Sequence, residues 1–163
     1  MSLGLSGLKL KIKILHVCRN DKFIPPFIKF IEDNFEARKH FFWLKGHAKN
    51  HPAKDNKSTY QLRKSVLGQL IGYFFLIRIM NNAEKIILHG LLNQKVTFLL
   101  FCMPWLLKKS YWFIWGSDLY AHELGIGTWR WGIREFIRKP VIKKMGHLVT
   151  YIPGDVELAR KWY

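Results

Sequence analysis

The chain has 163 residues, of which 49% are hydrophobic and 15% aromatic, so it can bury a core and is not intrinsically disordered. Its 27 Lys and Arg against 11 Asp and Glu give a formal net charge of +16, which indicates an anionic partner: nucleic acid, an anionic membrane surface or a phosphorylated ligand. The longest uncharged apolar run, residues 96–107, is shorter than the roughly 20 residues that a membrane-spanning helix requires.

The cysteines and the missing motifs restrict the chemistry that the sequence can carry. Cys18 and Cys102 both lie within apolar runs, which indicates two buried free thiols in a reducing compartment. The sequence has no CxxC motif and no Cys and His cluster at zinc-binding spacing. It also lacks the GxGxxG, GxxxxGKS/T, HExxH and GxSxG motifs. We therefore predict neither a metal ion nor a cofactor.

Short apolar runs alternate with helical patterns along the chain. We predict five strands, at residues 12–18, 40–45, 84–89, 111–115 and 147–152. We predict helices at residues 25–35, 62–81, 94–107 and 128–145, and a last helix after residues 153–155. Two prolines should bend these helices, Pro104 in the third and Pro140 in the fourth. Residues 46–60 are polar and rich in Lys, Asn and His, which is typical of a surface loop.

This alternation predicts one domain with an α/β fold, in which helices flank a doubly wound, Rossmann-like parallel sheet. The crossovers between parallel strands should be right-handed. With the strands numbered in the order of prediction, two sheet orders are compatible with the pattern. Order 2-1-3-4-5, which we favour, places the topological switch between the first and third strands. Order 3-2-1-4-5 would place the switch between the first and fourth strands.

Polar residues and glycines follow the predicted strands, at the sheet edge where α/β domains bind ligands. Asn20 and Asp21 follow the first strand, and the third strand leads into His89 and Gly90. The fourth strand is an aromatic run that leads into Trp115, Gly116, Ser117 and Asp118. Glycines allow backbone N–H groups to approach a phosphate or a sugar closely. These residues therefore predict one ligand crevice.

Each of these residues has a structural explanation as well. Asp118 is well placed to cap a helix that follows the fourth strand. Asn20 and Asp21 can cap the helix that follows the first strand. A single histidine at the end of an apolar strand, such as His89, is more often a hydrogen-bonded core residue than a catalyst, and His16 inside the first strand fits a structural role.

The helix predicted at residues 128–145 carries a basic stripe. Arg130, Arg134 and Arg138 recur at intervals of four residues. Apolar residues line the other side of this helix: Trp129, Ile133, Phe136, Ile137 and Val141. A basic amphipathic helix of this kind suits a membrane surface that bears anionic lipid. The alternative is an ordinary helix that packs on the sheet and holds its polar side in water.

Four blocks of sequence resemble the TDP-N-acetylfucosamine:lipid II N-acetylfucosaminyltransferases of enterobacterial common antigen assembly. Residues 14–17 read ILHV, with an aspartate shortly after, and residues 87–90 read ILHG. Residues 112–120 read WFIWGSDLY, which is similar to the family's W-x-x-W-G-A/S-D-L-Y block and is the most specific of the four. A weaker match covers residues 144–158. The matches appear in the family's order and extend over nearly the whole chain.

The resemblance implies the N-terminal, acceptor-side domain of a two-domain GT-B glycosyltransferase. Such enzymes move a sugar from a nucleotide donor, here TDP-N-acetylfucosamine, to a polyprenyl-diphosphate-linked acceptor. They act as peripheral proteins at the cytoplasmic face of the bacterial inner membrane, in surface polysaccharide synthesis. Most of the donor site belongs to a C-terminal domain that we expect to be absent from this chain, so the chain alone should be inactive.

The resemblance also assigns roles to the residues at the sheet edge. Asp118 and His89 become candidate catalytic residues, and either can act as a general base on an acceptor hydroxyl. The candidate substrate-binding residues are Asn20, Asp21, Gly90, Trp115, Gly116 and Ser117. The candidate membrane contacts are Arg130, Arg134 and Arg138.

Two non-catalytic functions are alternatives. The net charge alone is compatible with a basic domain that binds nucleic acid, although the transferase hypothesis predicts no nucleic-acid partner. The basic stripe is compatible with a scaffold that docks on a membrane surface.

Overall fold

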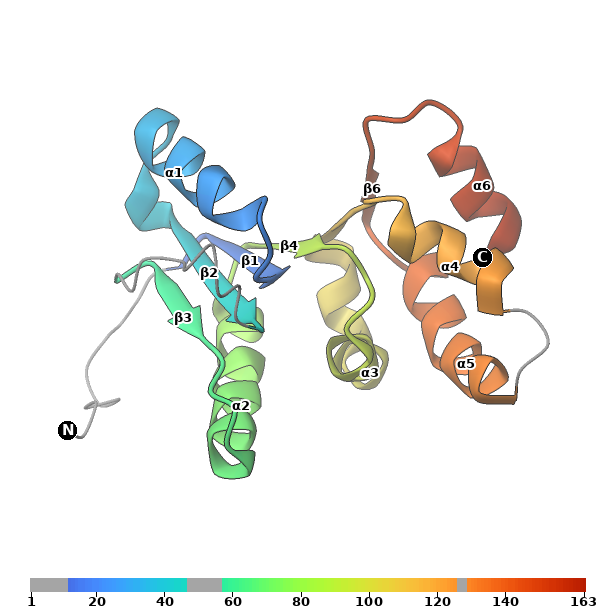
Figure 1. The fold of residues 1–163 in the computed structure, drawn as a ribbon, viewed down its shortest axis with the longest axis horizontal. Helices are drawn as coiled ribbons and strands as arrows, with labels where there is room; N and C mark the ends of the chain where they lie inside the picture. Colours follow the sequence, from blue (N-terminus) through green and yellow to red (C-terminus); the bar gives the residue numbers. More distant parts are fainter. Residues whose placement is uncertain (1–11, 47–56, 126–128) are drawn as a thin grey trace.

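The computed structural model describes residues 12–46, 57–125 and 129–163 (Figure 1). Its centre is a six-stranded, all-parallel sheet with the order β3-β2-β1-β4-β5-β6. The strands are β1 (Ile14–Arg19), β2 (His40–Lys45), β3 (Thr59–Gln61), β4 (Lys85–His89), β5 (Ser110–Phe113) and β6 (His147–Val149). The chain therefore has an α/β, Rossmann-like fold.

Helices connect these strands. The α-helices are α1 (Ile24–Asn34), α2 (Val66–Asn82), α3 (Gln94–Cys102), α4 (Ser117–Gly125), α5 (Trp129–Lys143) and α6 (Asp155–Trp162). Two 3₁₀ helices, η1 (Ala37–Lys39) and η2 (Pro104–Lys109), precede β2 and β5. Figure 1 shows α1 on one side of the sheet and α2, α3 and α5 on the other. None of the helices in the described part of the chain is long and apolar enough to cross a membrane.

Each face of the sheet has its own core. The larger core joins the strands to α2, α3 and α5, and its fully buried side chains include Trp43, Leu76, Ile86, Leu100 and Trp112. The smaller core joins β1 and β2 to α1 through Cys18, Ile24, Ile28, Ile31, Phe42 and Leu44. Alternate residues of β1 and β2 supply the two cores because successive side chains point to opposite faces.

The predicted sheet order is confirmed for the five predicted strands, which correspond to β1, β2, β4, β5 and β6. The topological switch therefore lies between β1 and β4, where the crevice was expected. At Pro104, where a bend was predicted, the helix is interrupted: α3 ends at Cys102 and a 3₁₀ helix begins at the proline. Pro140 lies inside α5.

Two expectations are wrong. The polar segment predicted as a loop contains most of β3, which pairs with β2 through Phe42, Trp43 and Leu44. A three-residue edge strand is too short to produce an alternating pattern, so composition alone did not reveal it. The other error is Cys102, whose thiol lies on the exposed side of α3 although Cys18 is buried as expected. Residues 47–56 of the predicted loop lie outside the described residues.

Candidate functional site

Glycines in a left-handed backbone conformation follow four strands of the sheet. Gly46, Gly90, Gly116 and Gly154 come after β2, β4, β5 and β6 and have φ values of 90°, 80°, 77° and 93°. L-residues with a side chain rarely adopt this conformation, so each position favours glycine. Backbone N–H groups at these turns also donate within the protein, that of Gly90 to the carbonyl oxygen of Phe113 at 3.1 Å and that of Ser117 to the carbonyl oxygen of Trp115 at 3.0 Å.

Asp118 fastens the turns after β4 and β5 to each other. Its side chain is fully buried, and Oδ2 accepts hydrogen bonds from the backbone N–H of Leu91 at 2.9 Å and from Nε1–H of Trp112 at 2.5 Å. Oδ1 accepts a hydrogen bond from the backbone N–H of Trp115 at 3.0 Å. Asp118 lies in the first turn of α4, but its carboxylate binds donors that precede this helix. Asp118 therefore has a structural role at this edge, because its two carboxylate oxygens accept three hydrogen bonds from the surrounding chain.

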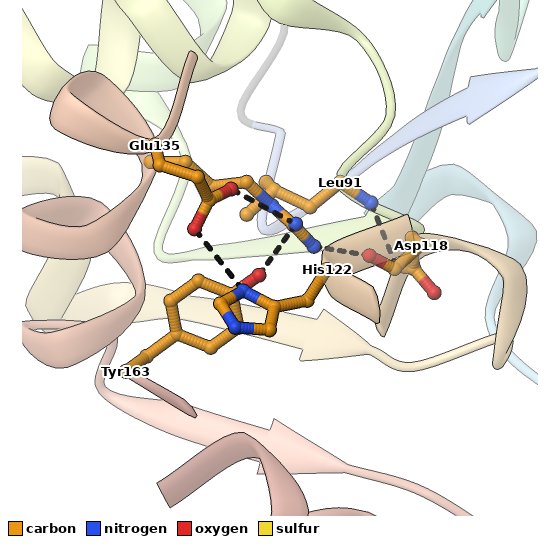
Figure 2. Close-up of polar contacts among 6 residues, drawn as sticks. Leu91, Asp118, His122, Glu135 and Tyr163 are labelled. Carbon is orange, nitrogen blue, oxygen red and sulfur yellow. Dashed lines mark hydrogen bonds and ion pairs between the residues drawn. The ribbon is translucent and has the colours of Figure 1, made fainter. Parts of the chain in front are cut away.

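A buried network holds Asp118 from the side of α5 (Figure 2). The Arg138 guanidinium donates to the carbonyl oxygen of Asp118 and, at 2.6 Å, to the hydroxyl of Tyr163. It also lies 3.4 Å from Glu135 Oε1, and Glu135 Oε2 lies 3.5 Å from Nδ1 of His122. Burial raises the pKa of Tyr163, so its hydroxyl stays protonated at neutral pH. The network anchors the end of the described chain to the sheet edge.

The position of Arg138 corrects one prediction. Its side chain is buried, so it does not belong to a surface stripe. Arg138 can be buried because three acceptors inside the fold compensate its loss of hydration. Arg134 is partly exposed, with its guanidinium 5.4 Å from the ring of Trp131. The side chain of Arg130 lies outside the described residues, so its contact with a membrane remains a prediction.

The outward side of α5 is apolar instead. Trp129, Ile133 and Phe136, which were expected opposite the arginines, are 73%, 56% and 74% exposed. The outer side of α2 also exposes large apolar side chains: Val66, Leu67, Leu70, Ile71 and Phe74. Scattered apolar residues are normal on a surface, but repeated exposure along one helix side is typical of a docking face.

Three histidines form a hydrogen-bonded chain across the centre of the sheet. Nδ1 of His16 lies 3.0 Å from Nε2 of His89, and Nε2 of His16 lies 2.9 Å from Nδ1 of His40. Burial lowers the pKa of all three imidazoles, that of His89 to about 4, so all three are neutral at pH 7. Nδ1 of His89 is buried and has no hydrogen-bond partner in the described structure.

Three cations gather at the same edge. Arg19 ends β1, Lys45 ends β2, and Lys95 lies in the first turn of α3. Burial lowers the pKa of Lys45, and the nearby charges of Lys95 and Arg19 lower it further. None of the ion pairs in the described part of the chain involves these three residues, and Nζ of Lys45 donates instead to Oδ1 of Asn93 at 3.1 Å. The group is therefore an uncompensated positive site, suited to an anion.

The other predicted residues lie around this edge. Asn20 is buried, and its amide donates to Oε1 of Gln61 at 3.3 Å. Asp21 is exposed and accepts from the backbone N–H of Phe23 at 2.9 Å in the turn before α1, but it does not cap this helix, whose N-cap residue is Phe23. Phe23 is half exposed, and its ring lies 5.9 Å from that of Trp115, which is also half exposed. These two rings form an aromatic rim where α1 approaches the turn after β5.

The structure brings part of the predicted site together. A Cβ atom placed on Gly90 would lie 3.5 Å from Oδ2 of Asp118 and 3.8 Å from Trp115. The ring of His89 lies 6.3 Å from that of Trp115, which places the histidine chain beside these turns. Ser117 is exposed at the start of α4, and the structure records no contact from its side chain to the other predicted residues.

The sequence places Arg19 at this edge, next to Asn20, but sequence reasoning missed Lys45 and Lys95, as well as the roles of His16 and His40. The cations had a signal, since a basic residue ends each of the first two strands directly before the polar or glycine turn. The histidine contacts had none, because they depend on which strands are neighbours.

Comparisons of the chain with protein-family models, with curated proteins and with solved structures find no match. The described residues also contain no group of three or more His, Cys, Asp or Glu side chains that could hold a metal ion. The functional assignment therefore depends on the geometry of the sheet edge.

Proposed function

We propose that the chain is the acceptor-side domain of a GT-B glycosyltransferase. Its reaction is the transfer of an amino-deoxy sugar such as N-acetylfucosamine from a TDP-sugar to a polyprenyl-diphosphate-linked acceptor in surface polysaccharide synthesis. The site of action is the cytoplasmic face of the bacterial inner membrane, where the protein is peripheral. The donor contacts come mostly from a second domain.

The observation that carries the proposal is the cation group of Arg19, Lys45 and Lys95 at the carboxyl edge of the sheet. A diphosphate carries several negative charges over two phosphorus centres, and Lys and Arg are its usual protein ligands. The rim formed by Phe23 and Trp115 offers aromatic surface to the apolar or sugar part of the acceptor.

The exposed apolar sides of α2 and α5 support the membrane part of the proposal. Five residues of α2 and three of α5 expose large apolar side chains, and Arg63 and Lys64 lie just before Ser65, the N-cap residue of α2. Apolar residues next to cations favour the surface of an anionic bilayer, which is where a polyprenyl-linked substrate is embedded.

Binding of farnesyl diphosphate, a soluble polyprenyl diphosphate, tests this proposal directly. The Lys45→Gln substitution should weaken binding about 10-fold, because one charge-assisted contact contributes about 1.5 kcal/mol or more. Lys29→Gln on α1 is the matched control, since it removes the same charge from an exposed position outside the edge. Isothermal titration calorimetry measures both dissociation constants.

Equal effects of the two substitutions, or equal binding of farnesol, would show that the edge does not recognise the diphosphate. A DNA oligonucleotide that binds more tightly than farnesyl diphosphate, with a steep dependence on salt concentration, would favour the nucleic-acid alternative.

A further inference from the structure

The histidine chain joins three neighbouring strands of the sheet through two side-chain hydrogen bonds. His40 begins β2, His16 lies in the middle of β1, and His89 ends β4. The chain therefore runs diagonally across three neighbouring strands, from the amino end of β2 to the carboxyl edge with the candidate site. His16 is fully buried, whereas His40 and His89 are only partly buried.

Three neutral imidazoles joined by two hydrogen bonds can exist in two tautomeric arrangements. Each neutral imidazole carries one N–H and one bare nitrogen, so two hydrogen bonds allow only two arrangements of the three protons. In the first, His89 donates from Nε2 to His16, His16 donates from Nε2 to His40, and Nδ1 of His89 is bare. In the second, every bond runs the other way, and Nδ1 of His89 carries a proton. The chemical character of Nδ1 is thus coupled to the state of His40.

We propose that His40, His16 and His89 form a proton relay that deprotonates the acceptor hydroxyl at the sheet edge. This inference rests on the proposed transferase function. His89 is the catalytic base, and His16 and His40 are positioning residues that carry the proton away. The relay starts from the first arrangement, because a bare buried nitrogen is easier to accommodate than a buried N–H without an acceptor.

The step balances in protons and electrons. The acceptor O–H bond breaks as Nδ1–H of His89 forms, and the hydroxyl oxygen attacks the anomeric carbon of the nucleotide sugar, whose nucleoside diphosphate leaves with the bonding electron pair. His89 passes its Nε2 proton to Nδ1 of His16, and His16 passes its Nε2 proton to Nδ1 of His40. His40, now an imidazolium, releases its own Nε2 proton to water.

The surroundings explain why one histidine is not enough. Phe27 from α1 packs edge-on against His16 and His89, Phe42 stacks on His16, and Phe113 stacks on His89. Burial in this setting disfavours a cation on His89 and lowers its pKa to about 4. His40 is nearer to water, and Lys39, itself paired with Glu36, is the charge that acts on it. Moving the positive charge to His40 therefore makes His89 an effective base.

Imidazole ¹⁵N NMR of the histidine-labelled chain tests the relay without any assay of transfer. Nδ1 of His89 should be bare at pH 7 and should become protonated as His40 titrates, although His89 itself stays neutral. In His40→Asn the amide retains a hydrogen-bonding atom near the position of Nδ1 but cannot take up a proton, so this response of His89 should disappear. His147→Asn removes a stacked histidine of β6 outside the chain and should leave the response intact.

The relay would be overturned if Nδ1 of His89 is protonated at pH 7, or if its ¹⁵N chemical shift does not change as His40 titrates. In the native transferase, His40→Asn should lower kcat by roughly 10²-fold with little change in KM for the acceptor, a typical contribution of general acid–base catalysis. Unchanged kcat would also overturn it. If the native two-domain protein transfers no sugar while the NMR coupling is present in the chain, the proposed function fails and the proton coupling stands.

Discussion

At the scale of single residues, Asp118 was a candidate catalytic residue, but its contacts give it a structural role. The sequence marks it because it follows an aromatic strand and a glycine. In the fold its carboxylate accepts three hydrogen bonds from Leu91, Trp112 and Trp115, and its carbonyl accepts one from Arg138. With its oxygens occupied in the core, Asp118 positions the two turns that form the edge, which leaves His89 as the stronger candidate for the base.

Replacement of Asp118 should therefore reduce stability before it affects chemistry. In Asp118→Asn an amide N–H₂ would face hydrogen-bond donors, and we expect a loss of about 3 kcal/mol in the free energy of unfolding. Urea unfolding measures the loss, and Asp33→Asn at an exposed position of α1 is the control. A stable Asp118→Asn variant that binds farnesyl diphosphate normally but has lost transfer activity would instead support a catalytic role.

The residues of the site were predictable from sequence, but their partners were not. Strand ends are visible as apolar runs that stop at polar residues, so Asn20, His89 and Asp118 could be named. Their contacts come from residues distant along the chain, such as His16, which lies 73 positions from His89. Such pairs depend on strand order and register, which a periodic pattern does not contain.

At the scale of elements, α5 is the clearest departure from the sequence pattern. The basic stripe indicated an outward arginine side, yet Arg138 and Glu135 are buried and Phe136 is exposed. Amphipathic patterns assume that apolar residues turn inward. Here Arg138 finds the Asp118 carbonyl and Tyr163 inside the fold, and these contacts override the pattern.

The exposed side of α5 makes a testable docking face. The double substitution Ile133→Ser with Phe136→Ser should reduce binding to vesicles that contain anionic lipid, because it removes two apolar side chains that would enter the bilayer interface. The free energy of unfolding should change by only about 0.5 kcal/mol, since both side chains are exposed in the fold. Vesicle sedimentation and urea unfolding provide the two measurements.

A matched pair at the same element keeps this test specific. The control is the double substitution Lys139→Ser with Lys143→Ser, which changes exposed residues of α5 to the same side chain without removing apolar surface. Any difference in vesicle binding between this variant and the wild type should disappear at high salt, because it comes from charge alone. If the apolar double variant sediments with vesicles as the wild type does, α5 is not the contact, and α2 becomes the face to test.

For the whole molecule, the fold followed from the alternation of elements far better than from any single element. Five apolar runs separated by helical segments define a parallel sheet, and right-handed crossovers restrict the order. Strand β3, which the sequence pattern did not predict, lies at one edge of the sheet, so the switch point between β1 and β4 is unchanged. A local error in an edge strand therefore did not move the candidate site.

The histidine chain should also make the stability of the whole molecule depend on pH. Folding lowers the pKa of His16, His40 and His89, the last from 6.5 to about 4. The unfolded chain thus binds protons at these sites at a higher pH than the folded chain does, so acid favours unfolding. The stabilisation is complete above pH 6.5 and decreases as the pH falls toward 4.

The size of this effect can be measured by urea unfolding at a series of pH values. His89 alone should account for about 2 kcal/mol of lost stability between pH 7 and pH 5, and His16 should add to it. His89→Phe, which places an apolar ring among Phe27 and Phe113, should flatten the dependence, whereas His147→Asn should leave it unchanged. Stability that stays constant or rises from pH 7 to pH 5 would mean that the three imidazoles are not held neutral by the fold.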